Sequence, residues 1–224
     1  MGGPLTGHRE SIFGLVFGDR LLATAGGDGT IRFWDPATRR PLGGPVVTHS
    51  RYVYDLASSP DGRTVAAAGA DGAITLWDAL THRRTGRPLS GHSGQVLRVA
   101  FSPDGGTLAS TGTDGTVRLW DLPTLRQVGP PMTGHGDGPL AVAFSPDGTL
   151  LATAGGNGAA GPAGQEPVGW YGTIPEGVPD GVVFLWGAIP GADPGRVCAM
   201  AGRRDLTQAE WDLYVGDWPR EPVC

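Results

Sequence analysis

The chain has 224 residues, of which 39 are glycine and 20 are proline, and its formal net charge is −5. This length suits one domain with an appendage, and the lack of a Gly-X-Y period excludes collagen. The acidic balance argues against binding to nucleic acids or to anionic membranes.

Short apolar segments, separated by turns rich in glycine, proline and aspartate, predict β strands from residue 12 to residue 186. The second segment of each group, such as LLATA at 21–25, lacks alternation, which is typical of a sheet covered on both faces. Residues 2–8 resemble residues 86–92 and predict the fourth strand of a preceding group. The other predicted strands are 12–17, 21–25, 30–34 and 41–46; 53–58, 64–68, 73–77 and 84–89; 96–101, 107–111, 116–120 and 127–132; and 140–144, 150–154 and 182–186.

These groups follow an internal repeat that is most complete at residues 91–121, which open with Gly-His and close with Trp-Asp. Trp34, Trp77 and Trp120 are each 43 residues apart, and the opening histidines recur at nearly the same period. A fourth copy ends at Trp186, after an insertion rich in glycine and proline at 156–180. A period in the low forties with these end residues indicates one four-stranded blade per copy.

The repeat resembles the WD-repeat β-propeller family over roughly residues 4–187. The resemblance implies an all-β fold of four propeller blades, whose strands we letter a to d in chain order. Such blades are wedges that usually close a ring at about seven. We therefore expect a partial propeller, an open arc whose end blades leave apolar faces uncovered.

The repeat stops after residue 188, so we expect a blade segment at 1–188 and a short helical tail at 189–224. Asp193-Pro194 predicts a helix over 194–201, and the Thr207/Glu210 capping box predicts another over 208–214. This tail resembles the end of large actinobacterial multidomain proteins with C-terminal WD repeats.

An aspartate six residues before each tryptophan accompanies the histidines, and so does a hydroxyl ten residues before it in the first and third copies. In the fourth copy the insertion separates the hydroxyl from the tryptophan. This set superficially suggests a hydrolytic triad, but an enzyme needs one triad rather than several. In the family the set is a buried hydrogen-bond relay that ends on the indole N–H, so we expect a structural role. Its members are His8, Thr24, Asp28 and Trp34; His49, Asp71 and Trp77, with Ala67 in place of the hydroxyl; His92, Ser110, Asp114 and Trp120; and His135, Thr153, Asp180 and Trp186.

The resemblance also implies that the b–c and d–a loops share one face, where partners bind. Residues early in the a strands, together with the insertion, should reach that face, and exposed aromatic and arginine side chains are the usual anchors of interfaces. Packing between blades is the alternative for the aromatic residues, and packing on its own blade is the alternative for the insertion. The candidates are Phe13, Arg51, Tyr52, Tyr54, Gln95, Leu97, Leu140, Trp170 and Tyr171.

No metal or other cofactor is expected, because four of the five histidines belong to different copies and no spacing matches a zinc site. We expect Cys198 and Cys224 to be free thiols in a reducing cytoplasm, with a disulfide between them as the alternative. The N-terminal residues do not resemble a signal peptide, and no apolar run approaches the ~20 residues that span a bilayer. The expected location is the cytoplasm.

The function expected is a non-catalytic protein–protein interaction scaffold that binds its partner through the loop face. The alternatives are a regulatory or sensor fragment of an actinobacterial signalling NTPase or kinase, and a truncated remnant that needs partner chains to close the ring. Self-association of two arcs is a further way to complete a ring. No nucleic-acid or membrane partner is expected.

Overall fold

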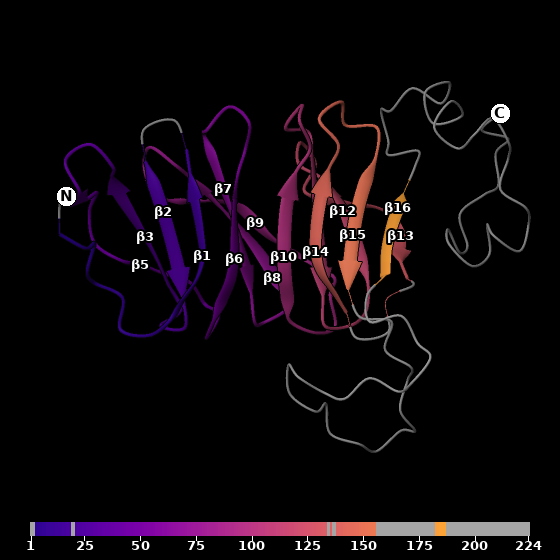
Figure 1. Cartoon of the computed structure of the whole chain (residues 1–224), viewed down its shortest axis with the longest axis horizontal. Helices are drawn as coiled ribbons and strands as arrows, with labels where there is room; N and C mark the ends of the chain where they lie inside the picture. Colours follow the sequence, from indigo (N-terminus) through magenta and orange to yellow (C-terminus); the bar gives the residue numbers. More distant parts are fainter. Residues whose placement is uncertain (1–2, 19–20, 134, 136–137, 156–181, 187–224) are drawn as a thin grey trace, which may run out of the picture.

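The structure is a computed structural model that describes residues 3–18, 21–133, 135, 138–155 and 182–186. These residues form strands and turns only, and the strands make four antiparallel sheets, so the predicted all-β class is confirmed. Figure 1 shows the sheets side by side, with the N-terminal sheet at one end of the row and β14 to β16 at the other. Among the described residues the row does not close, as expected for an open arc of four blades.

Each sheet is one blade, and its strands pair in chain order. Blade one has an interrupted fourth strand, because β4 and β5 both pair with β3. The strands are β1 Ile12–Phe17, β2 Leu22–Gly26, β3 Thr30–Asp35, β4 Arg40–Pro41 and β5 Val46–Val47; β6 Val53–Ser58, β7 Thr64–Gly69, β8 Ala73–Asp78 and β9 Arg84–Ser90; β10 Val96–Phe101, β11 Thr107–Gly112, β12 Val117–Asp121 and β13 Arg126–Met132; and β14 Pro139–Phe144, β15 Leu151–Gly155 and β16 Val182–Trp186.

The turn between the first two strands of blade three shows why its Ser-Pro-Asp-Gly sequence folds as it does. Ser102 Oγ donates to Asp104, and the N–H of Thr107 donates back to Ser102 Oγ at 2.9 Å. Gly105 has a φ of 73°, a conformation that glycine adopts without steric cost. The turn is therefore closed by its own side chains and reverses the chain into β11.

Three apolar cores lie between successive blades. The b strand of blade two contributes to two of them, since Ala67 packs towards blade one and Ala66 towards blade three. The prediction that b strands are covered on both faces is therefore confirmed for this blade. The a strands lie side by side across the arc, with β1 beside β6, β6 beside β10, and β10 beside β14.

Residues 3–8 differ from the prediction, because they form no strand. The described arc has no blade before blade one, and hence no third strand with which they could pair. Several other predictions fall outside the described residues: the insertion at 156–180 with Trp170, Tyr171 and Asp180, the helical tail, and both cysteines.

Candidate functional site

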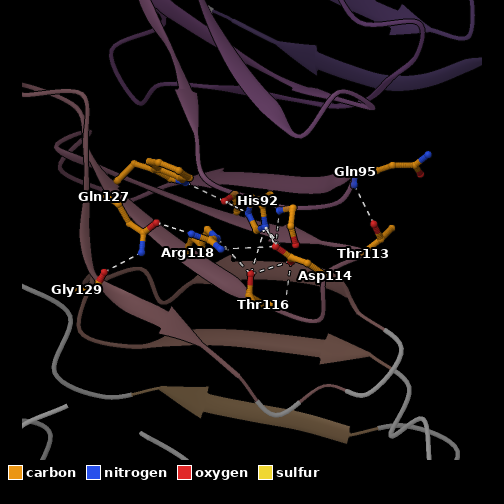
Figure 2. A network of polar contacts seen from close by, with 11 residues as sticks. His92, Gln95, Thr113, Asp114, Thr116, Arg118, Gln127 and Gly129 are labelled. Atoms are coloured by element: carbon orange, nitrogen blue, oxygen red, sulfur yellow. Dashed lines mark hydrogen bonds and ion pairs between the residues drawn. The ribbon is translucent and has the colours of Figure 1, made fainter. Parts of the chain in front are cut away.

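Four side chains of blade three are joined in one polar chain (Figure 2). The indole N–H of Trp120 donates to Ser110 Oγ at 2.8 Å, and Ser110 Oγ lies 2.8 Å from His92 Nε2. On the other side of the imidazole ring, His92 Nδ1 lies 3.0 Å from Asp114 Oδ1. These hydrogen bonds therefore form a relay across the blade. It links Asp114 in the b–c turn, His92 before the a strand, Ser110 in the b strand and Trp120 in the c strand.

The sequence of carboxylate, imidazole and hydroxyl is also that of a hydrolytic triad. Ser110, however, is fully buried and its oxygen already receives the indole N–H, so no substrate carbonyl can reach it. Blade one repeats the arrangement, with His8 Nε2 2.8 Å from Thr24 Oγ1 and Nδ1 3.1 Å from an Asp28 oxygen. A buried polar chain that recurs in this way satisfies hydrogen-bonding groups between strands, and offers no nucleophile.

The environment of the relay favours a neutral imidazole and an ionised carboxylate. Burial lowers the pKa of His92 and outweighs the opposite effect of the neighbouring carboxylate. Burial acts against ionisation of Asp114 too, but hydrogen bonds from His92 and Thr116 overcome it and lower its pKa to about 2. Arg118 lies 3.7 Å from the same carboxylate and donates to Gln127, which ties the relay to β13 (Figure 2).

Blade two does not form this hydrogen-bond relay, and the assignment of His49 to a relay is wrong. Its side chain is exposed, and the neighbouring Ser50 is buried instead, where its Oγ accepts the N–H of Asp71 at 3.3 Å. The indole N–H of Trp77 donates to Thr75 at 2.9 Å. The physical reason is Ala67, since without a hydroxyl at that position a buried imidazole would have no partner for Nε2.

In blade four the described residues contain the part of the relay that runs from the tryptophan to the histidine. Thr153 Oγ1 lies 2.9 Å from His135 Nε2 and accepts the indole N–H of Trp186 at 2.8 Å. Burial lowers the pKa of His135. Its Nδ1 is buried and has no hydrogen-bond partner within the described part of the chain, and Asp180 lies outside that part.

The candidate interaction residues share a backbone feature that sequence reasoning did not identify. Each a strand contains a β-bulge near its start, where one residue has no partner across the a–b ladder. The unpaired residues are Phe13, Tyr54, Leu97 and Leu140, one in each blade. Bulges re-aim a side chain, and these lie at the end of each blade that carries the b–c turn.

Two of these residues belong to a continuous group that we call the aromatic cluster: Phe13, Arg51, Tyr52 and Tyr54. The ring centroids of Phe13 and Tyr54 are 5.8 Å apart, and those of Tyr52 and Tyr54 are 6.2 Å apart. The Arg51 guanidinium carbon lies 5.0 Å from the centre of the Tyr52 ring, within the range of a cation–π contact. Phe13 is half-exposed and Arg51 is exposed, so the cluster is open to solvent.

The remaining described candidates differ in accessibility. Leu97 is only 5% exposed, so its assignment to the partner surface is wrong. Leu140 is exposed, as is the equivalent Phe13 of blade one. Gln95 is partly exposed, and Figure 2 shows its side chain pointing away from the relay while its N–H donates to Thr113 Oγ1 at 2.9 Å.

Asp55, next to Tyr54 in the chain, is a site residue that sequence reasoning missed. Its carboxylate accepts the N–H of Val99 at 3.1 Å and so links the a strands of blades two and three. Burial raises the pKa of Asp55, although that hydrogen bond and the charge of Arg98 act in the opposite direction. The available signal was an acid within an otherwise apolar a strand.

A half-open groove of about 470 Å³ lies between blades two and three, at the end that carries the Ser-Pro-Asp-Gly turns. Its walls include the apolar residues Leu76, Phe101 and Leu125. Its two carboxylates, Asp61 and Asp104, are already hydrogen-bonded within their own turns. The groove therefore lacks the convergent free polar groups that mark a small-molecule site.

The described residues contain no group of histidine, cysteine, aspartate or glutamate side chains that could hold a metal ion. Within the same residues there is no helix long and apolar enough to cross a membrane.

The family model described as "WD domain, G-beta repeat" matches residues 3–35, 44–78, 83–121 and 127–160, which together exceed half of the chain. Among solved structures, one titled "Structure of U3-55K" is similar at 28% identity with a TM-score of 0.62, over 68% of this chain and 48% of that chain. The present chain thus spans about half the length of that relative. No curated protein matches the sequence.

Proposed function

Because the chain belongs to the WD40 repeat family, we propose that it is a non-catalytic protein-interaction module that binds a partner protein through the face carrying the b–c and d–a loops. WD40 repeats of this kind indicate a protein-interaction domain. The observation that carries the choice of face is the aromatic cluster around Tyr54, which is solvent-accessible and stands on two adjacent bulges.

The composition of the cluster supports this proposal. Tyrosine and arginine are enriched among residues that dominate binding energy, because they bring a large contact area together with a polar group. Arg51 is held against Tyr52, and the three rings contact in series, so little side-chain freedom remains to be lost on binding. A partner segment with an apolar side chain beside an acidic one would match this surface.

The state of the polar chains supports a role without catalysis. Ser110 and Thr24 each accept an indole N–H in a buried position, so neither hydroxyl is free to attack a substrate. Three of the described histidines, His8, His92 and His135, are held in these relays. Of the other two, His82 stacks on Phe33 and His49 is exposed.

The proposal is tested by affinity capture with the whole chain from its native cell extract, followed by titration of the purified partner. Tyr54→Ala and Arg51→Glu are expected to weaken binding at least about tenfold. The matched control is Leu80→Ala, because Leu80 is strongly exposed on a turn of the same blade outside the cluster. Unchanged affinity in both cluster variants, with melting temperatures equal to wild type, would disprove the chosen face.

A further inference from the structure

The last strand of the arc exposes two large aliphatic side chains that are core residues in every other blade. Val183 and Leu185 of β16 are each 67% exposed. Their equivalents, from the pairing of the b and c strands, are Ile31 and Phe33, Ile74 and Leu76, and Val117 and Leu119, and none of these is more than 5% exposed. The same position is therefore buried three times and open once.

The first strand of the arc shows the converse. Leu15 of β1 is 61% exposed, whereas its equivalents Leu56 and Val99 are each 5% exposed. Phe17, two residues further along the same side of β1, is also exposed. We call these two residues the leading face, and Val183 with Leu185 the trailing face.

Inside the chain, the equivalents of the two faces pack against each other at every blade boundary. Ile31 and Phe33 share a core with Leu56, and Ile74 and Leu76 share one with Val99. The third boundary places Val117 and Leu119 with Val142. The trailing face of one blade thus fits the leading face of the next in three successive interfaces. The leading and trailing faces of the whole arc could therefore form a fourth interface of the same kind.

We propose that a second copy of this chain covers both faces, with the trailing face of each copy packed on the leading face of the other. The contact continues the blade-to-blade packing already present three times in each copy. Because the two faces are different, one contact leaves a free face on each partner, and only a second contact closes the assembly. Two arcs of four blades make eight, within the range of blade numbers in propeller rings.

The chemistry of the faces agrees with a blade as the occupant. The residues of β14 and β15 on the side of the trailing face are small: Ala141, Ala143, Ala152 and Ala154. The two on β15, Ala152 and Ala154, are equivalent to positions that are fully buried in the other blades. No charged side chain stands at any of these positions or on the leading face. A β sheet that presents apolar side chains fits such a surface, and the leading face of the chain, Leu15 and Phe17, supplies one.

The test is the molar mass of the full chain by gel filtration with light scattering over a range of concentrations. Wild type is expected at twice the chain mass, and Leu15→Arg and Leu185→Arg are each expected to reduce the dimer population at least about tenfold. Leu80→Arg, on an exposed turn away from both faces, should remain dimeric. An equimolar mixture of the two single variants retains one intact pair of faces, and should regain mass that neither variant shows alone.

Two results would overturn the proposal. One is a wild-type chain that stays monomeric at every concentration. In that case residues after 186 or another protein, and not a second copy, would have to cover the faces. The other is a dimer that persists in both arginine variants while their circular dichroism matches wild type. Because Tyr54 lies outside both faces, loss of partner binding in Tyr54→Ala without loss of mass separates this inference from the proposed function.

Discussion

The imidazole ring of His82 stacks on the ring of Phe33 in the preceding blade, with centroids 4.3 Å apart and planes 10° from parallel. His82 follows the c strand of blade two and has a φ of 57°, in the left-handed region. Arg39 and Leu125 occupy the same turn position in blades one and three, with φ of 59° and 55°. Leu125 likewise packs into the core between its own blade and the preceding one.

This relationship predicts opposite results for one substitution at two equivalent positions. Arg39→Gly should raise the free energy of unfolding by about 1 kcal/mol, because it removes the cost of a left-handed residue and Arg39 has no ring to stack on. His82→Gly removes the same cost but also the contact with Phe33, so it should gain less or lose stability. Urea unfolding of the two variants measures this difference. Equal gains would show that the stack contributes nothing.

The relay predicts a large effect of Asp114→Ala on stability. The substitution leaves His92 Nδ1 and the Thr116 hydroxyl without their acceptor, and buried unpaired groups of this kind cost about 1–3 kcal/mol. Asp71→Ala is the matched control, since Asp71 occupies the same turn of blade two with no histidine attached. Thermal unfolding of both variants should show the larger loss in Asp114→Ala. An unchanged melting temperature there would contradict the relay.

Acidification should lower stability in two stages. Burial lowers the pKa of His92 and His135 below the ordinary value of 6.5, so the unfolded chain takes up protons first and the unfolding free energy falls as pH drops below about 6.5. The pKa of Asp114 is lowered from 3.8 to about 2, so its contribution is present above pH 4 and is lost between about pH 4 and pH 2. Urea unfolding at a series of pH values tests both stages. NMR titration showing His92 protonated above pH 6.5 would contradict the first.

Asp55 predicts a difference between two substitutions. Asp55→Ala should destabilise the protein by about 1–3 kcal/mol, because the N–H of Val99 loses its acceptor. Asp55→Asn keeps an acceptor oxygen and removes a charge whose burial raises the pKa of the acid, so stability at pH 7 should be equal to or above wild type. Chemical unfolding at pH 7 distinguishes the two. A loss in the asparagine variant as large as in the alanine variant would show that the charge itself is needed.

Local features of the repeat were readable from the sequence because they depend on neighbouring residues. The strand segments, the Ser-Pro-Asp-Gly turns and the spacing of hydroxyl, aspartate and tryptophan all follow from short-range rules, and blades one and three join these side chains as that spacing suggests. His49 shows the limit of such reasoning. It keeps its place in the repeat, but a relay histidine also needs a hydroxyl from the b strand, which is distant in sequence. In blade two that position is Ala67, so the imidazole has no hydrogen-bond partner in the core.

The bulges and the accessibility of the candidate surface depended on the tertiary structure. Leu97 and Leu140 hold the same place in their strands, yet the first is buried and the second exposed. Leu119 and Leu185 also hold the same place, and they differ because Leu119 packs against blade four whereas no described blade follows Leu185. The sequence alone determined which residues are apolar and on which side of a strand they lie. Only the packed structure decided which of them are covered, since burial requires a second surface that no local pattern contains.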